Sequence, residues 1–565
     1  MRKKMRIYLA VLVLFFTNAL VVSAQHRQVH AVEVRHPLEK LEDAFVPGVR
    51  NARINLPGYR YFKHGATGTS TSIFTTQVNV DFNGQNITGD AANEPNIAIN
   101  PLNKNEIVIG WRQFDNVTSN FRQAGCGYSA DSGYTWTFPG VIEPGVFRSD
   151  PVLDYDAAGN FYYNSLTVDS FGNYPCKVFR SSNGGVLWDA GVDAAGGDKQ
   201  WMAIDRTGGV GEGNIYSFWT SYYSSCQPGF FTRSTTGGNS YESCTEVDGD
   251  PHLGTMALNN DGDLFIAGAA FQDIVVSKSE NARNAGSLIA WNFPQIAPVD
   301  GYLGYGLSVN PGGLLGQANI DVDRSGGPGS GNVYVLASVV RASVIDSGDV
   351  MFTRSLDGGL NWDVPVRVND DPTTSAYQWF GTMSVAPDGR IDAVWLDTRD
   401  NPGSDLSALY YAYSTDQGSS WSANEKLSDT FDPHVGYPDQ YKMGDYFDMV
   451  SFDDGAYLAW ANTLNGEEDV YFSYIVPPVA STVGGVSASP QFSIYPNPAN
   501  DLLRINAGKV PSQIEIFSVP GQKVLETTIS KPTQEINISA LPAGIYFIKW
   551  NYGGNNQGVK KLIRL

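Results

Sequence analysis

The sequence predicts an all-β chain: a seven-bladed β-propeller, with a six-bladed one as the alternative, followed by a small Ig-like β-sandwich. The first observation is that the pattern Ser-x-Asp-x-Gly-x-x-Trp recurs along the chain. The second is a more regular unit of paired short strands that recurs seven times within residues 71–476. The third is composition, because 60 Gly, 29 Tyr and 12 Trp in 565 residues suit a chain rich in strands and turns.

The clearest copy of the turn motif runs from Ser355 to Trp362. Its Asp or Asn side chain can accept hydrogen bonds from backbone N–H groups of the turn, and its Gly allows a positive φ. The Trp then anchors the hairpin under the next strand. Other copies begin at Ser129, Ser181 and Ser414, and a weaker one spans Ser234 to Tyr241. The motif residues are Asp131, Gly133, Trp136, Asn183, Gly185, Trp188, Asp357, Gly359, Trp362, Asp416, Gly418 and Trp421.

Each of the seven longer units holds a short strand, a turn and a more apolar strand. The units begin at Glu94, Asp150, Gln200, His252, Gln317, Trp379 and Asp445. With a third and a fourth strand between successive units, this pattern predicts seven four-stranded blades. The seventh unit has only three strands before Pro477. We therefore expect residues near 76–82 to supply its outer strand and close the ring, which removes two open sheet edges.

The turn copies resemble the Asp-box, or BNR, repeats of sialidase-like β-propellers. The resemblance implies a propeller that interacts with glycans, and in this family the Asp-box lies away from the catalytic pocket. Sialidases use three arginines on the substrate carboxylate, a Tyr nucleophile with a Glu partner, and an Asp acid/base. They also carry a Phe/Tyr-Arg-Ile-Pro motif before the first blade. The nearest match, Ala52-Arg53-Ile54-Asn55, lacks the aromatic residue and the proline.

The face opposite the turn motifs should carry the residues that precede each first strand or follow each second strand. Guanidinium groups suit a sugar carboxylate, and paired carboxylates suit glycoside hydrolysis. The candidate catalytic residues are Arg112, Asp397, Arg399, Asp445 and Tyr446. The candidate ligand-binding residues are Glu94, Asp150, Trp201 and Trp379, with the indole rings placed to stack on sugars. The alternative interpretation is structural, with tryptophans packing between blades and Asp–Arg pairs tying loops down.

Three functions fit these residues. The first is a non-catalytic propeller that binds a glycan, a polysaccharide or a protein. The second is a glycoside hydrolase of the exo-α-sialidase type, and the third is a structural or adhesive surface protein. Neither Gly-x-Ser-x-Gly, His-Glu-x-x-His nor a P-loop occurs in the sequence. We expect no cofactor and no metal site; calcium stays open, although no Asp-x-Asp-x-Asp-Gly loop supports it.

The N-terminal segment predicts export. Residues 1–25 have a basic start, an apolar core at 7–22 and a small-residue cleavage site, Val22-Ser23-Ala24, as in a secretory signal peptide. Residues 26–70 are interpreted as a pro-segment or a strap across the fold. No later apolar run is long enough to span a membrane, so we expect no transmembrane segment in the mature chain.

Residues 477–490 have the composition of a linker, and residues 491–565 form the small β domain. Its markers are Tyr495-Pro-Asn-Pro-Ala-Asn-Asp501, Leu541-Pro-Ala-Gly-Ile-Tyr-Phe547 and the terminal Lys560-Lys-Leu-Ile-Arg-Leu565. This domain resembles the C-terminal sorting domain of the Bacteroidetes type IX secretion system. The resemblance implies that the type IX machinery is a partner of residues 491–565 and that the protein is secreted or held on the outer-membrane surface.

Charge and cysteine content narrow the partners. The net charge is −20, and the body between the two basic ends carries −28, which should repel nucleic acid and anionic membranes. We expect a monomer with a glycan or polysaccharide ligand. The four cysteines of an exported chain can form disulfides, with Cys226–Cys244 the favoured pair and Cys126–Cys176 the second. The alternative is that one or both pairs stay reduced and buried.

Overall fold

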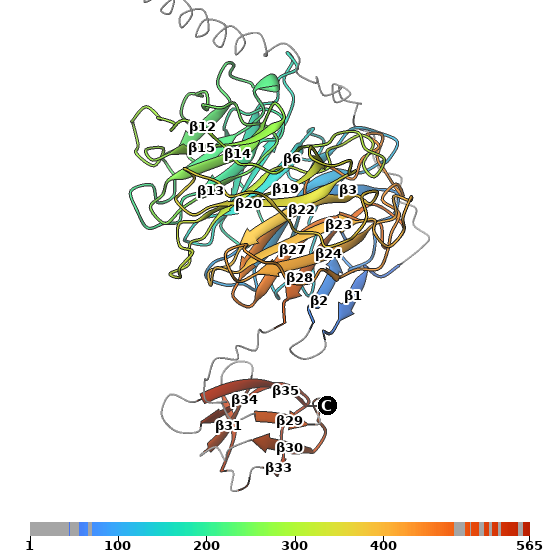
Figure 1. Cartoon of the computed structure of the whole chain (residues 1–565). Helices are drawn as coiled ribbons and strands as arrows, with labels where there is room; N and C mark the ends of the chain where they lie inside the picture. The colour runs from blue at the N-terminus through green and yellow to red at the C-terminus, as the bar shows by residue number, and fades with distance from the viewer. Residues whose placement is uncertain are drawn as a thin grey trace, which may run out of the picture. The chain divides into compact units, whose positions relative to one another are not determined.

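The computed structural model describes residues 45, 56–65 and 70–478, and most of residues 492–564 (Figure 1). The predicted signal peptide, much of segment 26–70 and most of the predicted linker lie outside the described residues. The chain divides into two compact units, Met1–Val479 and Ala480–Leu565. The regular structure of the described residues consists of strands, apart from the 3-10 helix η2 (Ser221–Tyr223). The described part of the chain is therefore all-β.

The described part of the first unit holds seven antiparallel sheets, numbered here in chain order. The first three are β3 (Ala91–Ile99), β4 (Ile107–Phe114) and β5 (Gln123–Ser129); β6 (Ser149–Tyr155), β7 (Phe161–Leu166), β8 (Cys176–Ser181) and β9 (Val192–Asp193); and β10 (Trp201–Ile204), β11 (Ile215–Phe218) and β12 (Phe231–Ser234). The fourth is β13 (Met256–Leu258), β14 (Leu264–Ala270), β15 (Asp273–Ser279) and β16 (Gln295–Ile296).

The fifth sheet is β18 (Asn319–Val322), β19 (Val333–Arg341), β20 (Asp349–Ser355) and β21 (Val366–Arg367), with β17 (Gly301–Tyr302) also paired to β19. The sixth is β22 (Gln378–Val385), β23 (Ile391–Asp397), β24 (Ala408–Ser414) and β25 (Glu425–Lys426). The seventh is β26 (Asp448–Phe452), β27 (Gly455–Asn462) and β28 (Asp469–Val476), followed by β2 (Ser72–Gln77) and β1 (Arg60–Lys63) from the N-terminal side.

The first strands of the seven sheets contact one another in a circle, β3–β6–β10–β13–β18–β22–β26, and β26 returns to β3. Side-chain acceptors at the start of or in one first strand bind backbone N–H groups of the first strand that follows it in the circle, and we call these acceptors the girdle. Without them these N–H groups would be unpaired along the inner edges of the sheets. Six steps of the circle carry such a bond: Asn96 to Leu153, Asp154 to Ile204, Thr255 to Ile320, Asp321 to Val385, Ser384 to Ser451 and Asp448 to Ile97.

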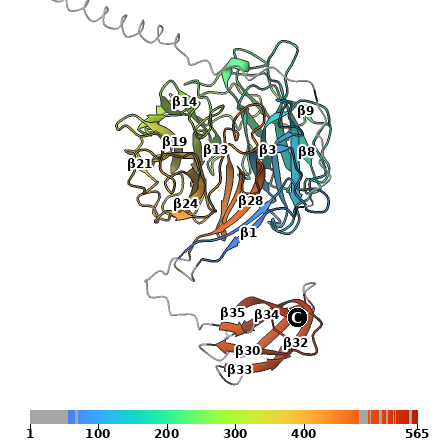
Figure 2. The same ribbon diagram turned by 90° about the vertical axis from the view of Figure 1, so that its right-hand side faces the viewer.

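The N-terminal strand completes the seventh sheet, as the sequence predicts. β2 pairs antiparallel with β28, with Ser72 opposite Val476 and Gln77 opposite Tyr471. The pairing begins four residues before the expected segment 76–82. β1 pairs with the outer side of β2 and adds one more strand to the sheet; Figure 2 shows β1 and β28 at this edge. The sheet therefore joins the two ends of the described part of the first unit.

The turn motif has the predicted hydrogen bonds. In the copy that follows β24, Ser414 Oγ accepts from Gly418 N at 2.9 Å, and Asp416 Oδ1 accepts from Ser420 N at 2.9 Å. The turn also docks onto the preceding sheet, because Gly418 lies against the Phe352 ring of β20 and Trp421 packs on that ring at 5.2 Å between centroids. The copy at Gly133 lies in the same way against Phe472 of the seventh sheet. In these two copies the motif thus fixes a sheet to its predecessor.

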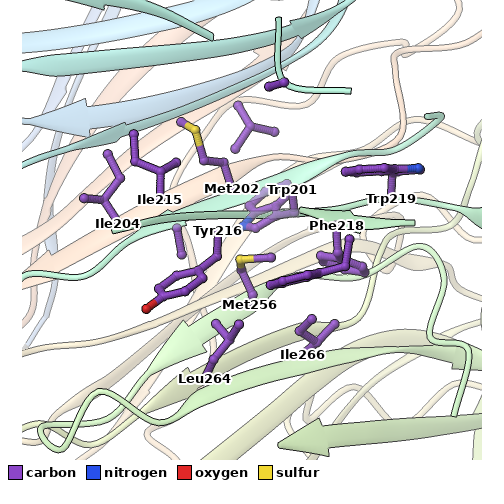
Figure 3. Close-up of a cluster of buried hydrophobic side chains, with 14 of the residues drawn as sticks. Trp201, Met202, Ile204, Ile215, Tyr216, Phe218, Trp219, Met256, Leu264 and Ile266 are labelled. Carbon is purple, nitrogen blue, oxygen red and sulfur yellow. The ribbon is translucent and has the colours of Figure 1, made fainter. Parts of the chain in front are cut away.

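The interface between the third and fourth sheets shows how the cores are built (Figure 3). Large apolar side chains from both sheets interdigitate there: Trp201, Met202, Ile204, Ile215, Tyr216, Phe218, Trp219, Met256, Leu264 and Ile266. All of them are buried. Period-two alternation therefore fails as a guide inside these strands, because both faces of each sheet are covered by a neighbouring sheet.

One of the two predicted disulfides is confirmed and the other is wrong. Cys226 and Cys244 are bonded. Cys126 and Cys176 are free and buried, because β5 and β8 place them in two different hydrophobic clusters. Burial raises the pKa of both thiols, which keeps them protonated and unreactive.

The second unit has two sheets, β29 (Phe492–Tyr495), β30 (Leu502–Ala507) and β33 (Thr533–Asn537) in one, and β32 (Lys523–Thr527), β31 (Gln513–Ser518), β34 (Gly544–Asn551) and β35 (Gln557–Arg564) in the other. Leu503 and Ile505 of the first sheet share one core with Ile514 and Ile548 of the second. Within the described part of the chain, no helix is long and apolar enough to cross a membrane.

Candidate functional site

Four of the predicted site residues meet in one buried group where the first strands begin. We call this group the axial cluster: Glu94, Arg112, Asp150, Lys199, Lys442 and Asp445. Lys199 Nζ lies 2.9 Å from Asp150 Oδ2 and 2.9 Å from Asp445 Oδ2. Lys442 Nζ lies 2.6 Å from Asp445 Oδ2, and Arg112 Nη2 lies 3.3 Å from Glu94 Oε1. The pairs join the first, second, third and seventh sheets.

The backbone orients three of these side chains in the same way in the first, second and third sheets. Glu94, Asp150 and Lys199 have φ of 48°, 50° and 54°, in the left-handed region that side chains rarely adopt. At Glu94 and Asp150 the register of the first strand shifts, so that two residues oppose one on the second strand. Such a bulge redirects a side chain, here away from the pleat and into the cluster. Lys199 and Lys442 escaped the sequence analysis, although Lys199 directly precedes the third unit.

The charges of the axial cluster neutralise one another. Burial acts to raise the pKa of Asp445, but Lys199 and Lys442 outweigh it and hold that pKa well below its usual value. Burial acts to lower the pKa of Lys199, and Asp150 and Asp445 reverse that effect. Burial raises the pKa of Glu94 to about 8, against the influence of Arg112 and Lys199. Asp445 is therefore held ionised by its two lysines, whereas burial opposes the charge that Glu94 carries beside Arg112 and Lys199.

Tyr446 is also buried, and its hydroxyl donates to Pro151 O at 2.9 Å. Burial and the nearby carboxylates raise its pKa well above the ordinary value. A catalytic nucleophile is activated by a base or by a lowered pKa, whereas the Tyr446 hydroxyl donates to a backbone carbonyl and its pKa is raised. The segment 303–316 covers this end of the fold, since Leu314 N donates to Asp445 Oδ1 at 2.9 Å and Asn310 Nδ2 donates to Gly444 O at 2.8 Å.

The two predicted stacking rings are inaccessible, which corrects the expectation that they bind sugars. Trp379 is fully buried and donates from Nε1 to Ser407 Oγ at 3.1 Å. Trp201 is 8% exposed and packs edge-on against Tyr446. Their positions at the start of first strands face neighbouring sheets instead of solvent.

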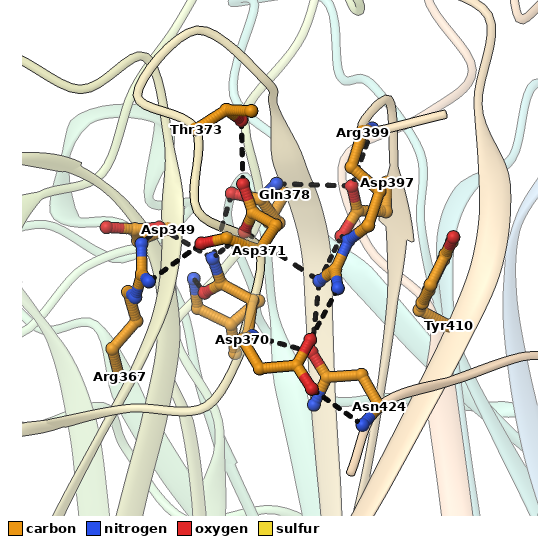
Figure 4. A network of polar contacts seen from close by, with 12 residues as sticks. Asp349, Arg367, Asp370, Asp371, Thr373, Gln378, Asp397, Arg399, Tyr410 and Asn424 are labelled. Atoms are coloured by element: carbon orange, nitrogen blue, oxygen red, sulfur yellow. Dashed lines mark hydrogen bonds and ion pairs between the residues drawn. The ribbon is translucent and has the colours of Figure 1, made fainter. Parts of the chain in front are cut away.

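Asp397 and Arg399 belong to a different network, between the fifth and sixth sheets (Figure 4). Arg399 Nε donates to Asp397 Oδ2 at 2.8 Å, and its Nη1 donates to Asp370 Oδ1 at 2.6 Å. Asp397 also accepts from Trp395 Nε1 at 2.8 Å. This pair ties the loop after β23 to the connection between β21 and β22, which is the structural alternative that the sequence analysis left open.

A cavity of about 390 Å³ lies inside the circle of first strands and has lining residues from all seven sheets. Three carboxyl groups of the girdle line it, Asp154, Asp321 and Asp448. Burial raises the pKa of Asp448 to about 7, and the charges of Asp154 and Asp321 add to the effect. Because Asp448 already accepts from Ile97 N at 3.0 Å, its first role is to close the circle.

Replacing Asp448 with asparagine should change how stability depends on pH. The folded protein holds the Asp448 proton up to about pH 7, whereas the unfolded chain loses it near the ordinary value of 3.8, so the free energy of unfolding falls as pH rises between them. Asparagine keeps the acceptor for Ile97 and removes the titration. As pH rises from 5 to 8, the free energy of unfolding of Asp448→Asn should increase relative to that of the natural protein by about 2–3 kcal/mol.

Denaturant unfolding at the two pH values checks this, with the exposed Asp388→Asn as the control. An equal effect of Asp448→Asn at both pH values would contradict the expectation.

An open groove that the sequence analysis missed lies between the loop after β11 and the segment that leads to the fourth sheet. It has a volume of about 530 Å³ and is lined by Ser221, Tyr222, Gln227, Pro228, Phe230, Glu246, Val247, Asp248, Gly249 and Asp250. The Tyr222 ring is 39% exposed. The signal in the sequence was the pair Cys226 and Cys244, whose disulfide joins the groove loop to the strand-like segment before Glu246.

The groove is firmly held. Gln227 Nε2 donates to Tyr222 O at 2.9 Å, and Trp291 Nε1 donates to Glu246 O at 3.1 Å. Trp219 Nε1 donates to Ser224 Oγ at 2.9 Å beneath the loop. The exposed ring and the carboxylates are thus presented on a backbone with little freedom to collapse, as a preorganised binding surface requires.

The model of the family described as "Secretion system C-terminal sorting domain" matches residues 493–564. The second unit is a type IX sorting domain. The sorting domain places the protein outside the cell or on the outer-membrane surface, and it makes the type IX secretion machinery a partner. No curated protein matches the chain.

Several solved structures are similar at low identity. A protein of unknown function from Dyadobacter fermentans has 13% identity and a TM-score of 0.41, covering 73% of this chain and 98% of its own. A fungal alcohol oxidase of the AA5 family in complex with copper has 10% identity and a TM-score of 0.43, and the match covers 90% of this chain and 100% of the oxidase. Trypanosoma rangeli sialidase has 10% identity and a TM-score of 0.35, and the match covers 74% of this chain and 60% of the sialidase.

Proposed function

We propose that the first unit is a seven-bladed β-propeller of the sialidase-like Asp-box type, carried to the cell exterior by the sorting domain, where it binds neutral glycan chains without cleaving them. Seven sheets whose first strands contact in a circle support the blade count. The serine and aspartate hydrogen bonds of the repeated turns support the Asp-box assignment.

The groove is the observation that carries the binding function. An aromatic face offers a sugar ring an apolar platform, while carboxylate and amide groups bind hydroxyls, and ligand sites combine these two features. The groove sets the exposed Tyr222 ring beside Gln227, Glu246, Asp248 and Asp250. Its volume of about 530 Å³ leaves room for more than one sugar unit.

The charge of the site favours a neutral ligand. Its lining holds three acidic side chains and neither lysine nor arginine, and the surrounding body is strongly acidic. An anionic sugar such as a sialic acid would be repelled. Binding is favoured over hydrolysis because Arg112, Asp445 and Tyr446 are buried in bonds within the protein.

A glycan array followed by titration calorimetry tests the proposal with the purified protein. We expect binding to neutral glycans and a loss of affinity of about tenfold or more in Tyr222→Ala, which corresponds to about 1.4 kcal/mol. Tyr134→Ala is the matched control, because Tyr134 is also exposed but lies in a turn motif. A folded protein that binds none of the neutral glycans, or equal affinity of Tyr222→Ala and the natural protein, would refute the proposal.

A further inference from the structure

Phe171 is an exposed aromatic side chain that the fold does not explain. It is 88% exposed, in the loop that joins β7 to β8 of the second sheet. The turn beneath it is tightly bonded, because Asp169 accepts from Phe171 N at 2.8 Å, from Asn173 N at 2.9 Å and from Asn173 Nδ2 at 3.0 Å. These bonds, with burial opposing them, lower the pKa of Asp169. The ring is therefore held in solvent by an ordered turn.

The Phe171 loop and the groove loop are in direct contact. Tyr174 N donates to Tyr223 O at 3.1 Å, and the Tyr174 and Tyr223 rings lie 4.9 Å apart between centroids. Tyr223 ends η2, and its neighbour Tyr222 lines the groove. The loops of the second and third sheets are thus joined by direct bonds, with an exposed aromatic ring on each.

We infer that Phe171 is a second stacking platform and that the groove binds an extended polysaccharide chain, whose units reach from the fourth sheet across the third to the second. This inference rests on the proposed function and adds the ligand's length to it. A chain of several sugars can engage both rings, one on each loop. Once one part of the chain is bound at Tyr222, its contact with Phe171 forms within the same complex. The two contacts together therefore bind more tightly than either alone.

Affinity should therefore rise with chain length. The probes are the neutral hexasaccharides of glucose, xylose and N-acetylglucosamine, each with its disaccharide, titrated into the purified protein. For the series that binds, we expect the hexasaccharide to bind about tenfold or more tightly than the disaccharide. Phe171→Ala should remove that difference and leave disaccharide affinity unchanged, because the disaccharide occupies Tyr222 alone.

Phe82→Ala is the matched control. Phe82 is also 88% exposed, and its turn has the same chemistry, with Asp81 Oδ1 accepting from Asn83 N at 2.8 Å and Gln85 N at 2.9 Å. We expect it to keep the length dependence. Equal affinity for disaccharide and hexasaccharide, or a length dependence that survives in Phe171→Ala, would overturn the inference while leaving the groove as a binding site. Absence of binding by every probe and array glycan would overturn the proposed function itself.

Discussion

Replacing Lys199 with methionine lowers the free energy of unfolding by about 3–5 kcal/mol, the usual cost of removing one partner from a buried ion pair. Lys199 bonds to Asp150 of the second sheet and Asp445 before the seventh, both at 2.9 Å and both out of solvent. Methionine fills a similar volume and leaves both carboxylates without this cation. Denaturant unfolding at pH 7 measures the change.

Lys426→Met is the control, because Lys426 also pairs with an aspartate, Asp400, at 2.7 Å, but at an exposed site. Its expected cost is below about 1 kcal/mol. If the two variants lose the same small amount of stability, the axial cluster is no stronger than a surface ion pair. A circular dichroism spectrum like that of the natural protein would show that the variant compared is folded.

Replacing Gly418 with alanine lowers the free energy of unfolding by about 2–5 kcal/mol. Its φ of 75° costs an alanine about 1–2 kcal/mol. The new methyl group would also collide with the Phe352 ring of the preceding sheet, which costs about 1–3 kcal/mol more when a packed interface must shift. Thermal and denaturant unfolding measure the sum.

Gly403→Ala separates the two contributions. Gly403 has a φ of 79°, and a methyl group added there meets no atom within 4 Å. Its cost should be the backbone part alone, about 1–2 kcal/mol. Equal losses in both variants would mean that the turn motif does not press against its neighbour, and that its repetition has another cause.

Local chemistry explains what the sequence predicted well. The Asp416 turn forms from residues within eight positions of one another, so its hydrogen bonds follow from the motif itself. The outer strand of the seventh sheet was predictable at long range because that unit visibly lacked a strand and β2 has the residues to supply it. Cys226 and Cys244 were predictable because they flank one hairpin.

The site was harder to predict because burial and loop paths depend on distant parts of the chain. Arg112 and Asp445 were expected in one place, and they are in one cluster, but segment 303–316 covers it, which no local pattern announced. Asp397 and Arg399 lie at the end of the second strand of their repeat, as Arg112 does in its own, yet they face the fifth sheet. The groove depends on the path of the loop that carries Tyr222, whose sequence has no repeat to compare with.

The pairing of β2 with β28 has a consequence for how the chain folds. Ser72 pairs with Val476, so this contact closes a loop that holds nearly all of the described part of the first unit. The entropy lost in closing so long a loop must be met before the pairing contributes, and such contacts slow folding. Each sheet can form locally from consecutive strands, whereas the seventh waits for both ends. The first described strands of the chain, β1 and β2, are thus among the last to find their places.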